Sequence, residues 1–336
     1  MSKENINNKY VDLVSSTRGN VVENIHQGIA VAMDSEGRVI KQWGDITTEI
    51  FPRSALKLIQ TFGIITSGAD KGLRLKDEQI ALATSSHHAE TVHLDMVKTW
   101  LIELGIEEED LMLGPAWPLG QKRKDYIVRH EGRKSRIYHN CSGKHCGQLS
   151  ICKHNKFKTL KYNDPKHPVQ KLFIENLEKL AEVKIKNIGI DGCNLPAPSL
   201  PLNQFAKALT KFADPSKLEG IEQKAVIKIF ESCVKHPVLF GGSESVNSIL
   251  TKSSNKKVLV KNGADGVFIA VIPDEKSVLV VKIKDGNMKA AEVAIAGLLE
   301  EMKFLNNEET KKIKSQPILN STLQKIGKIE WIATKD

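Results

Sequence analysis

The sequence GVFIAVIPDEKSVLVVKI (residues 266–283) predicts a β-hairpin near the C-terminal end of the chain. Two runs of β-branched and other apolar residues flank the turn at Pro273-Asp274-Glu275. A second hairpin is predicted near the other end, where residues 28–33 and 39–43 enclose a turn at residues 34–37. Because hairpins join antiparallel strands, we expect one antiparallel sheet built from both ends of the chain.

The middle of the chain is predicted to be helical. Apolar residues recur at helical spacing in residues 55–65, 91–104, 168–183, 202–212 and 220–234. Further strands are predicted at residues 10–16, 188–190, 258–261 and 326–332, with a late helix at residues 290–302. Strands and helices do not alternate as they do in a parallel α/β sheet. We therefore expect an α+β fold in which a helical region packs against the antiparallel sheet.

We expect one domain over residues 1–336, with two lobes. The sheet lobe is predicted at about residues 1–50 and 235–336, and the helical region at about residues 51–234. Neither an internal repeat nor a low-complexity tract divides the chain.

Composition indicates a globular protein that does not enter a membrane. Hydrophobic residues make up 40% of the 336 residues and charged residues 26%. No run approaches the ~18 apolar residues of a membrane span, and residues 1–8 lack the apolar core of a secretory signal. The five cysteines are an odd number, scattered through a long chain, which argues against a disulfide framework. We expect a cytoplasmic protein.

The formal charge of +9 raises the question of nucleic-acid binding. Most of the basic residues are lysines, and the only local clusters are residues 122–124 and 133–136. Arginine's planar fork is the usual reader of bases and phosphates, and aromatic residues, which stack on single strands, are only 5%. We therefore expect no nucleic-acid partner. The charge can still steer anionic substrates towards the protein.

The pair Ser54 and Lys57 is the first candidate for chemistry. Pro52 suits the first turn of a helix, and residues three apart on a helix share a face. A serine becomes a nucleophile when a base removes its proton, and a partly buried lysine with a lowered pKa can be that base. The Ser-x-x-Lys spacing occurs in penicillin-binding proteins and class A β-lactamases. The alternative is an exposed lysine beside a serine of the first helical turn.

Two further segments occur in the order that serine acylases of the β-lactamase type require. Ser85-Ser86-His87 follows a predicted helix and can supply a second serine. Lys261-Asn262-Gly263, on a predicted strand, can supply a positive charge and a glycine that lets substrate approach the backbone. The alternatives are a pair of serines at a helix end and a strand that ends in an Asn-Gly turn.

A cysteine cluster offers a candidate metal site. Cys141 and Cys146 flank Lys144-His145, and Cys193 offers a third sulfur from a separate segment. The Cys-x-x-Cys spacing of common zinc sites is absent. Buried, inert cysteines are the alternative.

Taken together, these stretches resemble the asparaginase II family, the thermolabile Rhizobium-type L-asparaginases. The resemblance extends over nearly the whole chain. It rests on Arg18-Gly19 through Val22-Glu23, His26-x-Gly28, Phe51 through Lys57, Ser85-Ser86-His87-x-x-Glu90, Asn140 through His145, Asp191-Gly192-Cys193, and Lys261-x-Gly263 through Val267. The resemblance implies a serine β-lactamase-like fold, a homodimer, and hydrolysis of L-asparagine to L-aspartate and ammonia.

Carried over to this sequence, the resemblance implies two Ser–Lys tandems, Ser54 with Lys57 and Ser86 with Lys261. It also implies a zinc site made by Cys141, Lys144 and Cys193, and substrate-binding roles for Arg53 and Asp191. In the mechanism that follows, neutral Lys57 takes the proton of Ser54, whose oxygen attacks the amide carbon to form an acyl-enzyme.

The sequence departs from the family pattern at three places. Ala89 and Asn194 stand where the family has glycine. The segment Gly241 through Val246 stands where the family usually has a Gly-x-Gly-Arg-x-Asp-like run, so an expected arginine is missing. This departure keeps three alternatives open: a glutaminase, a β-lactamase-like serine hydrolase, and a catalytically silent relative that binds zinc or an amino acid.

Overall fold

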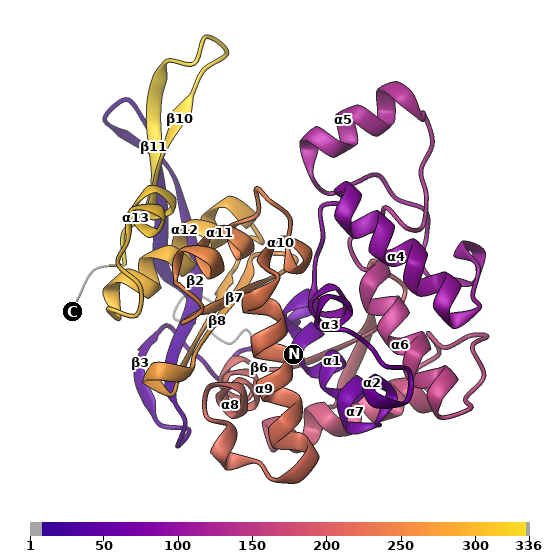
Figure 1. Cartoon of the computed structure of the whole chain (residues 1–336). Coiled ribbons are helices and arrows are strands. Elements are labelled where there is room, and N and C mark those ends of the chain that lie inside the picture. The colour runs from indigo at the N-terminus through magenta and orange to yellow at the C-terminus, as the bar shows by residue number, and fades with distance from the viewer. Residues whose placement is uncertain (1–8, 334–336) are drawn as a thin grey trace, which may run out of the picture. The chain divides into compact units, whose positions relative to one another are not determined.

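The structure is a computed structural model that describes residues 9–333, and Figure 1 shows its ribbon. The chain forms two compact units. The sheet unit contains the described residues up to 55, residues 200–214 and the described residues from 253 onward. The helical unit contains residues 56–199 and 215–252. Residues 200–214 were predicted in the helical region but belong to the sheet unit. Residues 235–252 were predicted in the sheet lobe but belong to the helical unit.

The sheet unit is built on an eight-stranded sheet in the order β10-β11-β1-β2-β9-β8-β7, with β3 also paired to β2. Every neighbouring pair is antiparallel. The strands are β1 (Val11–Arg18), β2 (Val21–Asp34), β3 (Val39–Trp43), β7 (Leu259–Gly263), β8 (Val267–Ile272), β9 (Ser277–Ile283), β10 (Ser315–Leu319) and β11 (Lys325–Trp331). The expectation of an antiparallel sheet built from both chain ends is confirmed.

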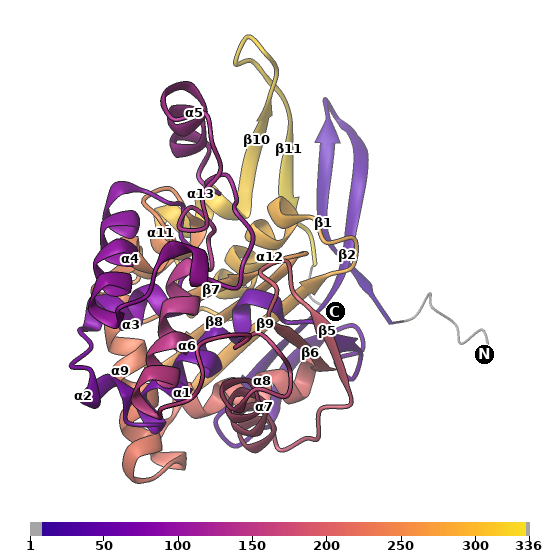
Figure 2. The ribbon, with the colours of Figure 1, turned by 90° about the vertical axis from the view of Figure 1, so that its right-hand side faces the viewer.

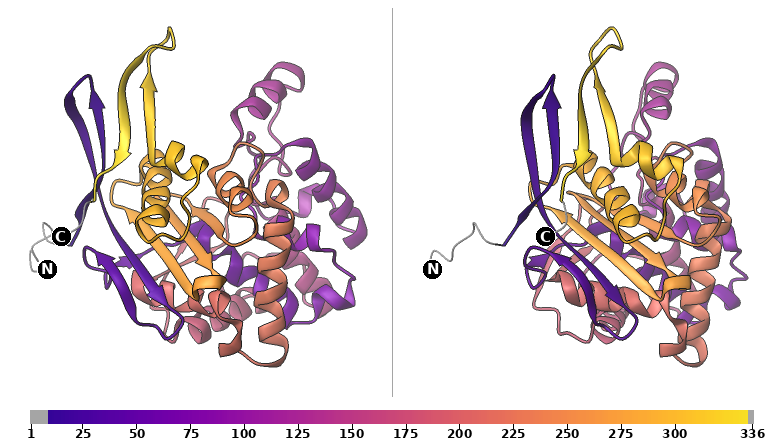
Figure 3. Two further views of the ribbon diagram at one scale, coloured as in Figure 1. Left: turned by 60° about the vertical axis from the view of Figure 1, so that its left-hand side comes forward. Right: turned by 90° about the vertical axis from the view of Figure 1, so that its left-hand side faces the viewer.

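The central strands β8 and β9 explain why helices are needed on both faces of this sheet. Every residue of β8 is buried, and β9 is buried along almost its whole length. A strand that is buried on both faces reads as a continuous apolar run, as here. Helix α8 (Leu202–Ala213) packs on β2 and β9, and α12 (Met288–Glu301) packs on β8, β9 and β11. Figure 3 shows α12 and α13 (Glu308–Lys314) against the strands.

Two long hairpins form the far end of this sheet. Figure 2 shows β1–β2 and β10–β11 side by side, and β1 pairs with β11 from Val14 to Ser16. The sequence analysis did not predict β10, which contains Pro317. Proline is compatible with an edge strand, because its missing N–H then interrupts no ladder in the sheet interior. β10 is indeed the edge strand.

The helical unit contains most of the remaining elements. Its helices are α1 (Lys57–Thr66), α2 (Ala69–Gly72), α3 (Asp77–Thr84), α4 (Thr91–Leu104), α5 (Gln121–His130), α6 (Ser142–His154), α7 (Pro168–Ala181), α9 (Gly220–Lys235), α10 (Pro237–Phe240) and α11 (Val246–Ser253). A smaller sheet consists of three strands, in the spatial order β4 (Glu49–Ile50), β6 (Pro196–Pro201) and β5 (Asn187–Ile190). Within the described residues, no helix is both long and apolar enough to span a membrane.

Two departures from the family pattern fall at residues with left-handed backbone conformation. Ala89 has φ 57° and Asn194 has φ 67°. Glycine adopts this region without a steric penalty, which gives a physical reason for a glycine at both places. Asparagine also tolerates it, whereas alanine pays roughly 1–2 kcal/mol. The substitution at residue 194 is therefore mild, and the strain is concentrated at Ala89, three residues after Ser86.

A close contact between α12 and β11 gives a test of the sheet unit. A Cβ at Gly297 would lie 2.3 Å from Cγ of Trp331. We expect Gly297→Ala to push the helix and the indole apart and lower the free energy of unfolding by roughly 1–3 kcal/mol. Thermal unfolding measures the effect. Gly114→Ala is the matched control, because no atom lies within 4 Å of its added Cβ. Equal melting temperatures for the two variants would contradict this packing.

Candidate active site

Lys57 is the centre of the candidate site in the helical unit. It begins α1 and its side chain is completely buried. Its Nζ donates to the carbonyl of Ser85, to Oγ of Ser86 at 3.2 Å and to the carbonyl of Asn140 at 3.4 Å. The structure therefore brings Lys57 and Ser86 together. These residues belong to different tandems in the sequence prediction.

The surroundings of Lys57 favour its neutral form. Burial removes the ammonium from water and lowers the pKa of Lys57, and the nearby Lys144 lowers it further, while Cys141 opposes both effects. A neutral amine has a lone pair with which to accept a proton. The lowered pKa of Lys57 therefore favours the state that a general base requires.

Two buried histidines hold the segment that carries Ser86. Nδ1 of His87 accepts the N–H of Ala89, so its Nε2–H donates to Oγ of Ser142 at 2.8 Å. Nδ1 of His93 accepts the N–H of Glu90, so its Nε2–H donates to the carbonyl of Val238 at 2.8 Å. The two rings stack with centroids 5.1 Å apart. Burial lowers the pKa of both histidines, which keeps both rings neutral.

The predicted zinc ligands also meet in the helical unit. Cys141 precedes α6, Lys144 lies in its first turn, and Nζ of Lys144 is 3.0 Å from Sγ of Cys193. A hydrogen bond from the Cys193 thiol, with Lys57 and Lys144 nearby, holds the pKa of Cys141 well below its usual range. The same hydrogen bond raises the pKa of Cys193. Burial opposes the charge of Lys144, but the adjacent cysteines and Asp191 outweigh burial and raise its pKa.

These three side chains fit a zinc ion in their chemistry. Two sulfurs, one of them with thiolate character, and one amine converge at a buried point, and zinc prefers sulfur and nitrogen ligands. The amine must lose its proton to bind, in competition with its raised pKa. Among residues 9–333, no group of three or more His, Cys, Asp and Glu side chains is placed to hold a metal. Zinc therefore stays a prediction.

Ser54 and Lys261 lie in the sheet unit. Ser54 is in a 3-10 turn, Arg53–Leu56, and is 8% exposed. The sequence placed it in the first turn of an α-helix, but α1 begins only at Lys57. Arg53 has φ 53°, a left-handed conformation that no regular helix contains. Lys261, on β7, is completely buried, and its Nζ donates to the backbone carbonyl and to Oδ1 of Asn262.

Gly263 brings strand β7 against the turn that carries Ser54. A Cβ at Gly263 would lie 2.2 Å from the carbonyl oxygen of Pro52 and 3.3 Å from the nitrogen of Ala55. Only glycine allows the two backbones to approach so closely. Lys261 is two residues away on the same strand, so Ser54 and Lys261 belong to adjoining segments.

The two predicted substrate-binding residues differ in their surroundings. Arg53 forms an ion pair with Asp265, which lies in the same unit. Asp191 acts on the cysteine cluster, where its charge helps to raise the pKa of Lys144. Their binding of substrate stays a prediction. Ser142 and His93 could not be recognised from the sequence, because Ser142 contacts the ring of His87 and His93 contacts the carbonyl of Val238, both far away along the chain.

The stacked histidines make stability depend on pH. In the unfolded chain a histidine titrates near pH 6.5, whereas the folded pKa of His87 and His93 is lower. The unfolded state therefore binds more protons below that pH, and stability is lost as the pH falls. The loss grows as the pH falls further below 6.5.

We expect the melting temperature to be steady above pH 7 and to fall between pH 6.5 and 5.5. His93→Gln should reduce the size of this fall, because one histidine no longer titrates. His130→Gln, at an exposed position of α5, is the control and should leave the fall unchanged. A parent protein whose melting temperature is equal at pH 7.5 and 5.5 would refute the neutral stack.

Comparison with known proteins identifies the family. The family model described as L-asparaginase II matches residues 14–331. No curated protein gives a significant match. Among solved structures, the chain is similar to a β-lactamase from Mycobacterium bovis, with 12% identity and TM-score 0.47 over 82% of this chain and 94% of that chain. It is also similar to a mutant simvastatin synthase from Aspergillus terreus, with 10% identity and TM-score 0.44 over 82% and 93%. Because the family match spans nearly the whole chain, the protein belongs to the L-asparaginase II family of amidohydrolases.

Proposed function

We propose that the protein hydrolyses L-asparagine to L-aspartate and ammonia, with Ser54 as the nucleophile. Family membership supports the reaction class. The observation that carries the proposal is the completely buried Lys57, whose pKa is lowered by burial and whose Nζ is 3.2 Å from the hydroxyl of Ser86. A lysine whose pKa is lowered by burial beside a serine hydroxyl is a candidate general base, because perturbed pKa values cluster at functional sites.

In the first step, neutral Lys57 takes the proton of Ser54, and Oγ of Ser54 attacks the side-chain amide carbon. The carbonyl oxygen becomes an oxyanion, and backbone N–H groups including that of Ser54 stabilise it. The Ser54 C–O bond is then complete and the C–N bond breaks. The leaving nitrogen takes a proton, so ammonia departs and Ser54 carries an aspartyl ester.

Ser86 and Lys261 are assigned to proton transfer and charge stabilisation. The hydroxyl of Ser86 accepts a hydrogen bond from Lys57, so it can pass the proton from Lys57 to the leaving nitrogen. Lys261 supplies a positive charge that stabilises the oxyanion. Water then attacks the ester while Lys57 accepts a proton from it. The bond between the acyl carbon and Oγ of Ser54 breaks, and Lys57 returns the proton to Oγ, which releases L-aspartate and restores Ser54.

We further propose that Cys141, Lys144 and Cys193 hold a zinc ion, and that Arg53 and Asp191 contact the substrate. A bound zinc supplies a fixed positive charge. It would also hold Cys141 as a thiolate, and that negative charge lies beside Lys57. On the family resemblance we propose a cytoplasmic homodimer.

The nucleophile is tested with Ser54→Ala and Lys57→Met. We expect each variant to lower kcat for asparagine at least about 1,000-fold, because each removes a group that acts in the bond-making step. Ammonia release measures turnover, and circular dichroism checks that each variant folds. Ser67→Ala, just after α1, is the control and should keep parental activity. Near-normal hydrolysis by Ser54→Ala would defeat the assignment.

The pH profile and the substrate range refine this test. Activity should be lost as the pH falls through the lowered pKa of Lys57, because the protonated amine cannot act as a base. Ammonia release from L-glutamine exceeding that from L-asparagine would make the protein a glutaminase. Opening of a chromogenic β-lactam without ammonia release would indicate the β-lactamase-like alternative.

Zinc binding is tested by metal analysis of protein purified after expression with added zinc. We expect about one zinc per chain in the parent and almost none in Cys193→Ala, since a third of the protein ligands is removed. Cys152→Ala, a buried cysteine on α6, is the control and should keep the metal. Zinc should also be released as the pH falls, because Lys144 then holds its proton. A zinc-free parent would contradict the site.

A further inference from the structure

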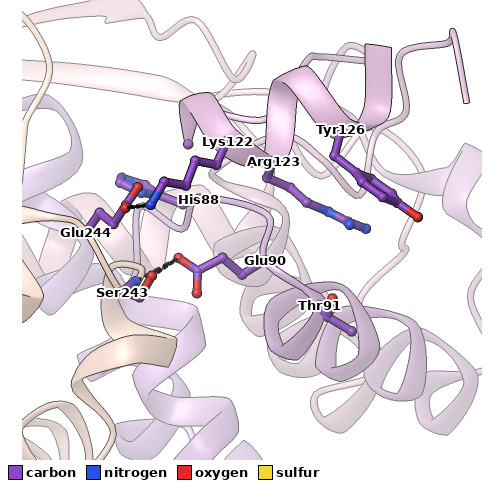
Figure 4. Close-up of a pocket in the computed structure, with 9 residues that line it drawn as sticks. His88, Glu90, Thr91, Lys122, Arg123, Tyr126, Ser243 and Glu244 are labelled. Atoms are coloured by element: carbon purple, nitrogen blue, oxygen red, sulfur yellow. Dashed lines mark hydrogen bonds and ion pairs between the residues drawn. The ribbon is translucent and has the colours of Figure 1, made fainter. Parts of the chain in front are cut away.

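The helical unit contains a pocket of about 360 Å³ that none of the residues assigned above lines. Figure 4 shows its walls: the start of α4, the first turns of α5, and Ser243 and Glu244 from the segment between α10 and α11. This segment is where the sequence departs from the family run that contains arginine. A pocket of this size accommodates a small metabolite.

Arg123 supplies one wall with an available cation. Its guanidinium lies 4.9 Å from the ring centroid of Tyr126, a cation–π contact that fixes the side chain against α5. Its Nε is buried and has no hydrogen-bond partner within the described residues. A ligand cannot reach this covered atom, but the guanidinium has four further N–H donors, for which the described residues supply no hydrogen-bond partner. Arg123 is therefore ready to bind a carboxylate.

Glu90 supplies an anion from another wall. Its Oε1 accepts the N–H of Ser243 at 2.7 Å and the hydroxyl of Ser243 at 3.0 Å, which fixes the plane of the carboxylate. No cationic side chain among residues 9–333 forms an ion pair with Glu90. An ionised carboxylate has about four acceptor sites, so Glu90 retains capacity for an ammonium.

The other two charges of the pocket neutralise each other. Lys122 and Glu244 form an ion pair between α5 and the opposite wall, and both side chains are exposed. What remains is one cation, Arg123, and one anion, Glu90, on different walls (Figure 4). A ligand that is only anionic meets the repulsion of Glu90, and a metal ion meets that of Arg123. A ligand with both charges satisfies both residues.

Two glycines pack closely against His88, which lines the pocket. A Cβ at Gly120 would lie 2.8 Å from Cβ of His88, and one at Gly242 would lie 2.6 Å from Cγ of His88. His88 thus packs between two backbone segments. Burial lowers the pKa of His88, so it adds a polar group without adding a charge.

We propose that this pocket binds a free zwitterionic α-amino acid, with the carboxylate on Arg123 and the ammonium on Glu90. The inference goes beyond the proposed hydrolysis, because it assigns a binding site to residues that have no part in the chemistry.

The test is calorimetric titration of L-asparagine into the full chain carrying Ser54→Ala, which prevents turnover. Arg123→Met and Glu90→Gln are each expected to weaken binding at one site at least tenfold. Arg129→Met, on the same helix but outside the pocket, is the matched control and should change the affinity less than twofold. Arg123→Lys, which keeps the charge but loses the planar fork, should fall between parent and Arg123→Met.

Two analogues locate the charged groups. L-asparaginamide lacks the α-carboxylate, so its affinity should be insensitive to Arg123→Met. N-acetyl-L-asparagine lacks the ammonium, so its affinity should be insensitive to Glu90→Gln. Parental affinity and stoichiometry in Arg123→Met, or no binding of L-asparagine by the Ser54→Ala chain, would overturn the proposal. Neither result depends on hydrolysis, so a failure of the proposed function leaves this test intact.

Discussion

The burial of Lys57 is the constraint around which the helical unit is organised. A lysine side chain cannot be taken out of water unless its nitrogen finds hydrogen-bond partners or loses its charge. Here three oxygens from two other segments lie within hydrogen-bond distance of Nζ, and burial lowers the pKa of the amine. The segments that supply Ser86 and Asn140 are thereby fixed to the start of α1. A single buried amine thus positions the groups nearest to it.

Backbone hydrogen bonds to histidine complete this positioning. The N–H of His87 donates to the carbonyl of Asn140 at 3.3 Å, while its ring connects the N–H of Ala89 to Ser142. The strained φ of Ala89 follows from this arrangement, because the chain must turn within two residues of His87 to present its N–H to the ring. A neutral ring is required, since an imidazolium has no nitrogen free to accept. The burial that lowers the pKa of Lys57 also lowers the pKa of this histidine.

The sequence was sufficient where local pattern and tertiary structure agree. The runs of valine and isoleucine at residues 267–272 and 277–283 are buried strands, as predicted. Helix α5 was not predicted, because only Ile127 among its residues is buried and no apolar stripe marks it. The sequence could not show that Ser86 contacts Lys57, because spacing along the chain does not measure distance in space. It predicted the tandem of Ser86 with Lys261 instead. The pocket between Glu90, Arg123 and Ser243 was missed for the same reason.

The two lysines of the buried cluster show how one environment creates opposite roles. Both are buried, so desolvation acts against the charge of each. The electrostatic effects of Cys193, Cys141 and Asp191 outweigh the cost of burial and raise the pKa of Lys144. These effects are weaker at Lys57, which also has Lys144 as a neighbour, so its pKa moves the other way. Neighbouring groups whose pKa values are driven apart are the usual mark of a divided acid–base task. The opposite pKa shifts of Lys144 and Lys57 thus follow from the groups that surround each amine.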